Sequence, residues 1–139
     1  MICDEVMVGF GRAGKMWGFQ QYEGVIPDMM TSAKGLTAAI QPMAVVGVRQ
    51  HIKEYFEDIP AGWGATYHAH PMGMACAYAS VKHMIDADIL GNVERMAPVL
   101  EEELDGLVAK HPSIARARCS GLFGCLDLIG PDGNSPQRM

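Results

Sequence analysis

The sequence predicts an α/β fold, because short apolar segments typical of strands alternate with longer segments of helical periodicity. Its 139 residues suffice for one domain of ordinary size with a buried core. Hydrophobic residues make up 49% of the chain, yet no apolar run approaches the roughly 20 residues that a membrane-spanning helix needs. We therefore expect a soluble, globular protein that makes no use of a membrane.

Charge and cysteine content narrow the class of protein further. The net charge is −5, and the 11 Lys and Arg residues form no cluster, which argues against nucleic acid as a partner. The four cysteines are scattered, and the chain shows no signal sequence, so we expect reduced thiols and a cytoplasmic location.

Three strands are predicted in the N-terminal half of the chain. Residues 2–8 form a mostly apolar run before a glycine cluster, which favours a strand buried on both faces, as in a parallel sheet. Residues 29–32 and 43–48 are the second and third strands, the last being rich in valine. Asp4 would lie in the first strand, and Lys34 in the loop after the second.

Helices are predicted for residues 49–56 and 71–87, separated by a segment with one proline and two glycines over 59–65. The second of these helices is expected to pack through one stripe, which contains Met72, Ala75, Cys76, Ala79 and His83.

The longest helix is expected to begin after Gly91, with Asn92 as its N-cap, and to be bent at Pro98. Its acidic residues would face solvent, and its apolar stripe would contain Val93, Met96, Ala97, Leu100, Leu104, Leu107 and Val108.

Two short strands, 114–119 and 122–129, follow the longest helix and would belong to a smaller subdomain. We accordingly expect a larger unit over residues 1–91, followed over 92–139 by a connecting long helix and the start of a smaller unit. Residues 130–139 are polar and turn-forming, and we expect them to be disordered. Because the chain starts directly inside a predicted strand, we expect it to be a piece of a longer protein.

A glycine-rich segment over residues 9–15 matches two nucleotide-binding patterns, G-x-G-x-x-G and most of G-x-x-x-x-G-K. The second pattern requires Ser or Thr after its lysine, but Met16 follows Lys15. The first requires a helix that begins in the glycine loop, and residues 16–20 show no helical stripe. We interpret the glycines as turn-formers, and a nucleotide-dependent enzyme remains an alternative.

His68 and His70 lie near Cys76 and could begin a metal site, but no carboxylate pair or Cys-x-x-Cys accompanies them. We expect no metal and interpret both histidines as hydrogen-bonded loop residues. A Gly-x-Ser-x-Gly nucleophile elbow is absent from the sequence.

Lys34 and Asp4 have complementary chemistry toward a single cofactor. A lysine in a water-poor pocket loses its proton readily and forms a Schiff base with an aldehyde such as pyridoxal phosphate. The pyridine nitrogen of that cofactor acts as an electron sink while a carboxylate keeps it protonated. Lys34 lies between Ala33 and Gly35 in an apolar segment, and Asp4 with Glu5 places two acids in an apolar strand. The plainer alternatives are a solvated lysine and a capping or salt-bridged carboxylate.

Residues 4–15, 27–36 and 65–71 together resemble the class III aminotransferases, the pyridoxal-phosphate enzymes of fold type I that include the omega-amino-acid transaminases. The blocks are DEVMVGFGRAGK, PDMMTSAKGL and ATYHAHP, and their order and spacing also agree with the family. The resemblance extends from residue 2 to about residue 128, and its specificity comes from the combination of the blocks.

The resemblance implies a role for each matched residue. Asp4 would pair with the pyridinium nitrogen, Val6 would pack on the cofactor ring, and Lys34 would carry the cofactor as a Schiff base and act in acid–base catalysis. Thr66 would bind the cofactor phosphate of the neighbouring subunit, which implies a homodimer with a shared active site. Met7 stands where the family often has glutamine, which puts a contact to the ring hydroxyl in doubt.

The resemblance further implies transfer of an amino group from an amino acid or amine to a 2-oxo acid. It implies part of the large domain, a mostly parallel sheet with flanking helices, and the start of the small C-terminal domain. The chain matches only the middle and the early C-terminal part of the family, so by itself it is expected not to complete transamination. A non-catalytic α/β module with a structural or binding role is the second hypothesis.

Overall fold

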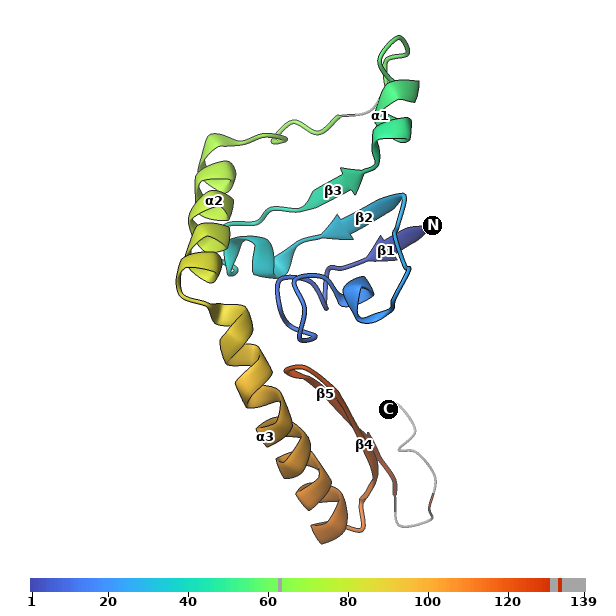
Figure 1. Cartoon of the computed structure of the whole chain (residues 1–139), viewed down its shortest axis with the longest axis vertical. Helices are drawn as coiled ribbons and strands as arrows, with labels where there is room; N and C mark the ends of the chain where they lie inside the picture. The colour runs from blue at the N-terminus through green and yellow to red at the C-terminus, as the bar shows by residue number, and fades with distance from the viewer. Residues whose placement is uncertain (63, 131–132, 134–139) are drawn as a thin grey trace.

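The predicted α/β fold is confirmed, with a three-stranded sheet in the N-terminal half, a two-stranded hairpin near the C-terminus and helices between them (Figure 1). A computed structural model describes residues 1–62, 64–130 and 133. The expectation of disorder over 130–139 therefore lies almost wholly outside the described residues. None of the described helices is both long and apolar enough to cross a membrane.

The N-terminal sheet has the order β1-β2-β3 and contains one parallel and one antiparallel pair. Strand β1 (Ile2–Asp4) runs parallel to β2 (Met29–Ser32), and β3 (Val45–Val48) runs antiparallel to β2. The connection from β1 to β2 contains a glycine-rich turn region and the 3-10 helix η1 (Gly18–Gln21). The carboxyl ends of β1 and β2 consequently lie at the same edge of the sheet.

Strand β1 is shorter than the predicted 2–8, because the backbone turns directly after Asp4. The Val6 N–H donates to Asp4 Oδ1 at 2.9 Å, and the Gly9 N–H donates to the Glu5 carbonyl at 3.0 Å. The expected burial on both faces is not observed in this chain, since Ile2 is 67% exposed. The predicted strand was too long because it followed the apolar residues alone, and these continue past Asp4 into the turn region.

Helices α1 (Gln50–Tyr55) and α2 (Pro71–Asp86) agree with their predicted bounds to within one residue, whereas the predicted packing stripe of α2 is wrong. The buried face of α2 contains Gly73 and Ala77, with Ser80 half-buried beside them. The Ser80 hydroxyl donates to the Gly35 carbonyl at 3.4 Å, which joins α2 to the 3-10 helix η2 (Lys34–Thr37). Small residues permit this close approach, so the larger Met72 of the predicted stripe lies outside it.

Helix α3 (Ile89–Lys110) begins three residues before the predicted N-cap, because Asp88 rather than Asn92 caps it. The Asp88 carboxylate accepts from the Gly91 N–H at 3.2 Å. A Cβ atom on Gly91 would lie 2.2 Å from Asp88 Oδ2, so this glycine accommodates the cap instead of marking a break. The predicted boundary between residues 91 and 92 therefore falls in the first turn of α3, and Pro98 lies inside the helix as predicted.

Part of the predicted apolar stripe of α3 packs against the hairpin of β4 (Ile114–Ser120) and β5 (Phe123–Leu128). Both hairpin strands match their predicted ranges closely. Two stripe residues, Met96 and Leu107, are exposed, and the others are buried or half-buried, namely Val93, Ala97, Leu100, Leu104 and Val108. The predicted solvent exposure of the acidic residues is confirmed for Glu101, Glu102, Glu103 and Asp105.

The tip of the hairpin is fixed to the glycine-rich segment that follows β1. The Leu122 N–H donates to the Arg12 carbonyl at 2.9 Å. Gly121 has φ +58°, and a Cβ atom on it would lie 2.3 Å from the Gly14 nitrogen. Two backbones therefore meet with no room for a side chain between them, and this contact attaches the C-terminal hairpin to the sheet region.

We predict that Gly121→Ala destabilises the protein more than Gly24→Ala does. Both positions have positive φ, so alanine costs roughly 1–2 kcal/mol in backbone strain at either one. A Cβ on Gly24 meets nothing within 4 Å, whereas one on Gly121 displaces the hairpin, for an expected total of at least about 3 kcal/mol. Urea unfolding of the two variants measures the difference, and equal losses would contradict the close contact.

An ion-pair cluster lies on the exposed face of the hairpin. Arg116 donates to Asp127 Oδ2 from Nε at 2.9 Å and from Nη2 at 2.8 Å, and Arg118 Nη2 donates to Oδ1 at 2.6 Å. Hydrogen bonds from Arg116 and then from Arg118 lower the pKa of the Asp127 carboxyl below its ordinary value. The charged form of Asp127 is thus favoured in the folded state.

Because the folded pKa of Asp127 is lowered, its contribution to stability should be present above the unfolded pKa of about 3.9 and lost as the pH falls below it. We therefore expect the urea midpoint of the unaltered protein to fall more steeply between about pH 5 and pH 3 than that of Asp127→Asn. Parallel pH profiles for the two proteins would show that the cluster does not contribute.

Candidate functional site

Asp4 and Lys34 are brought to one edge of the sheet by the parallel pairing of β1 with β2. Asp4 is the last residue of β1 and lies opposite Thr31, and the Glu5 N–H donates to the Thr31 carbonyl at 2.8 Å. Lys34 follows two residues after the end of β2 and begins η2. The predicted position of Asp4 in the first strand, and of Lys34 just after the second, is confirmed.

A cavity of about 240 Å³ lies at this edge and includes both Val6 and Lys34 in its lining. The other lining residues come mostly from the turn region after β1, and they are Met7, Gly9, Phe10, Arg12, Gly35 and Phe123. The Lys34 side chain is exposed and is not held in a water-poor pocket within this chain. Its amine contacts the thioether sulfur of Met7, which is only a weak hydrogen-bond acceptor.

The backbone at Lys34 is held in an uncommon conformation. Lys34 has φ +45°, and Phe10, which also lines the cavity, has φ +54°. Each costs on the order of 1 kcal/mol for a residue with a side chain, and such strain clusters at functional sites. A Cβ atom on Gly35 would lie 2.8 Å from Phe10 Cβ, so glycine after Lys34 lets the two segments approach.

Asp4 and Glu5 differ sharply although they are neighbours in the sequence. Asp4 is exposed at the sheet edge and accepts a hydrogen bond from the Val6 N–H. Glu5 is 2% exposed, and its carboxylate accepts from the Gly18 N–H at 2.7 Å and the Phe19 N–H at 2.9 Å. These bonds explain how an apolar region holds two adjacent acids. The sequence pattern predicts no role for Glu5, although the pair of adjacent acids in an apolar strand marks it as unusual.

Thr66 is not brought to this site by the fold of a single chain. It is exposed in a turn between α1 and α2, on a segment that runs along the side of β3 away from β1 (Figure 1). Thr66 is also absent from the lining of the cavity that contains Lys34.

The glycine-rich segment is a structural junction, and its interpretation as a set of turn-formers is confirmed. No α-helix begins there, since residues 6–13 form turns before the short η1. Lys15 Nζ pairs with Glu94 Oε1 of α3 at 3.4 Å. A Cβ atom on Gly11 would lie 2.7 Å from Leu90 Cδ2, so this segment packs against α3.

The predicted hydrogen-bonded role of the loop histidines is confirmed for His70. Its Nδ1 accepts from the Met72 N–H at 3.2 Å, which caps the N-terminus of α2. In the part of the chain that the structure describes, no three His, Cys, Asp or Glu side chains converge in a way that could hold a metal ion.

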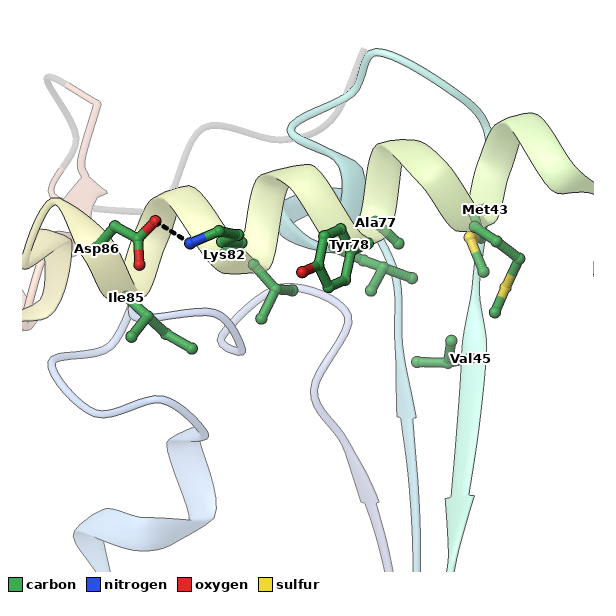
Figure 2. A pocket seen from close by; sticks show the side chains of 10 residues that line it. Met43, Val45, Ala77, Tyr78, Lys82, Ile85 and Asp86 are labelled. Carbon is green, nitrogen blue, oxygen red and sulfur yellow. Dashed lines mark hydrogen bonds and ion pairs between the residues drawn. The ribbon is translucent and has the colours of Figure 1, made fainter.

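A larger cavity, of about 610 Å³, lies between α2 and the segments of η2 and β3, and Lys34 is not among its lining residues. Figure 2 shows its apolar lining, which includes Met43, Val45, Tyr78 and Ile85. The charged groups in the lining are Lys82 and Asp86, which form an ion pair with each other on α2. This cavity therefore offers mainly apolar surface for packing, and its two charged groups are paired with each other.

The chain belongs to the class III aminotransferase family, since the family model "Aminotransferase class-III" matches residues 1–137. It is 38% identical over 92% of its length to a putrescine–pyruvate aminotransferase of Pseudomonas aeruginosa. It is 35% identical over 96% of its length to an uncharacterized aminotransferase of Sinorhizobium fredii. The resemblance found in the three sequence blocks is confirmed.

Solved structures give the same result for the fold. The crystal structure of a taurine:2-oxoglutarate aminotransferase from Bifidobacterium kashiwanohense, in complex with PLP and glutamate, matches 97% of this chain. The TM-score is 0.92 at 39% sequence identity. The chain spans 30% of that structure and 28% and 30% of the Pseudomonas and Sinorhizobium relatives.

Proposed function

We propose that this chain supplies the Schiff-base lysine and the ring-nitrogen carboxylate of a pyridoxal-phosphate-dependent aminotransferase. The substrates would be an amino acid or amine as donor and a 2-oxo acid as acceptor. The observation that carries the proposal is the parallel pairing of β1 with β2, which delivers Asp4 and Lys34 to one sheet edge in a chain of this family.

The residues at the edge fit the chemical groups of the cofactor. Lys34 offers an amine for the aldehyde, Asp4 a carboxylate for the ring nitrogen and Val6 an apolar side chain for the ring. Lys34 and Val6 line one cavity, and Asp4 lines a second cavity of about 360 Å³ that shares Phe123 with the first. When bound, pyridoxal phosphate supplies the electron sink that stabilises charge on the α-carbon of a substrate.

Each of these residues would then have a defined role. Lys34 Nζ would bind the aldehyde carbon covalently and, once displaced by the amino donor, would move a proton from the substrate α-carbon. Asp4 would hold the proton on the ring nitrogen, and Val6 would pack on the ring.

A homodimer with a shared site is part of the same proposal. Thr66 is exposed on a segment that does not reach its own Lys34 cavity, which supports binding of the cofactor phosphate in a second subunit. The division into a large-domain part over 1–91 and a small-domain part over 92–139 stays a prediction, as does the cytoplasmic location.

We predict that pyridoxal phosphate followed by borohydride labels Lys34 in preference to the lysines at 15, 53, 82 and 110. Peptide mass spectrometry locates the label, and Lys34→Arg, which keeps the charge but cannot form the Schiff base, is the matched control. Label spread evenly over the lysines, or none at all, would favour the non-catalytic α/β module instead.

We predict that Asp4→Asn slows the conversion of bound cofactor by an added amino donor at least about a hundredfold, because the amide does not hold the ring-nitrogen proton electrostatically. Cofactor affinity should change much less. Absorbance spectroscopy of the half-reaction measures both, with Asp28→Asn as a control at the other end of the β1–β2 pair. An unchanged rate for Asp4→Asn would count against the assigned role.

A further inference from the structure

The carboxylate of Glu5 closes the base of the loop that lines the Lys34 cavity. Its two hydrogen bonds join residue 5 to Gly18 and Phe19, so the intervening residues 6–17 form a loop whose ends are held together. Most of the cavity lining comes from this loop, namely Val6, Met7, Gly9, Phe10 and Arg12. The position of the cavity wall therefore depends on where Glu5 holds the loop ends.

The main chain of Glu5 is tied to β2 at the same place. Its N–H donates to the Thr31 carbonyl at 2.8 Å, and its carbonyl accepts from the Ser32 hydroxyl at 3.2 Å. Ser32 is fully buried and precedes Lys34 by two residues. One residue thus connects the loop, the end of β1 and the segment that leads to Lys34.

Burying a carboxylate is costly unless its oxygens are hydrogen-bonded, and capping a short helix does not require burial, because a surface residue can do it. Gly18 is also needed for this closure, since a Cβ atom on it would lie 2.7 Å from Val8 Cγ2. The arrangement is therefore more than a helix cap, because it closes the loop against the sheet.

We infer that Glu5 is a positioning residue, which fixes Asp4, Val6 and Lys34 relative to one another by closing the 6–17 loop and bonding to β2. The inference rests on the proposed function of Lys34 and Asp4, but its geometric part is testable without the cofactor.

The test compares Glu5→Gln with Asp88→Asn in the full chain. Each exchange turns a helix-capping carboxylate into an amide, but Asp88 caps α3 and is not part of the Lys34 cavity. Amide hydrogen exchange is followed at Gly9, bonded to the Glu5 carbonyl, and at Leu36, bonded to Ala33 beside Lys34. Selective labelling of Lys34 by pyridoxal phosphate and borohydride is measured at equal folded fractions.

For Glu5→Gln we expect about tenfold faster exchange at Gly9 and Leu36, because a buried N–H loses its acceptor and the loop opens more often. Labelling of Lys34 should fall several-fold relative to the other lysines, and Asp88→Asn should change neither measurement. If exchange accelerates only at Gly18 and Phe19 while Lys34 labelling is unchanged, Glu5 only caps η1 and the inference is overturned.

A second variant and the cofactor-free exchange measurement cover the cases in which Glu5→Gln does not fold or Lys34 is not labelled. If Glu5→Gln does not fold, Ser32→Ala removes the bond to the Glu5 carbonyl and keeps the carboxylate, and it should also accelerate exchange at Leu36. Unchanged exchange there would overturn the inference. If the unaltered chain does not label Lys34 selectively, the proposed function fails, whereas exchange at Gly9 and Leu36 still decides whether Glu5 positions the loop.

Discussion

The parallel pairing of β1 with β2 sets the relative positions of Asp4 and Lys34, because parallel strands end at the same edge of a sheet. Neither residue contributes to a core, and each is exposed. Their placement comes instead from backbone hydrogen bonds and from buried neighbours in the sequence, Glu5 beside one and Ser32 near the other. The two residues proposed to react are thus held in place by hydrogen-bonded backbone and by buried neighbours, not by burial of their own side chains.

The glycine-rich segment connects the parts of the molecule that lie on either side of it. It leaves β1, lines the Lys34 cavity, approaches α3 at Leu90 and supports the hairpin tip at Gly121. Glycines spaced for a tight backbone path also satisfy nucleotide-binding patterns, since both require close backbone approach. A turn-forming glycine segment and a dinucleotide-binding loop differ in the element that follows them. In this chain, turns and a 3-10 helix follow in place of an α-helix.

The sequence was sufficient for the element order, because strand and helix periodicities are local, and for the family, because three spaced blocks are specific in combination. It was insufficient for the cap of α3 and the packing face of α2. Those depend on Asp88 adopting φ +48° and on Gly73 and Ser80 meeting segments distant in sequence. The hydrogen bonds of the Glu5 carboxylate could not be predicted for the same reason, since its partners lie 13 and 14 residues away.

The left-handed backbone at Lys34 has a consequence for how this position can vary. Glycine or asparagine would adopt that conformation with less strain, so a search for greater stability alone would replace the lysine. Retaining an amine there means accepting a less stable backbone. Stabilisation of this chain guided by backbone strain alone would therefore tend to remove the amine that we propose to be reactive, unless position 34 is held constant from the start.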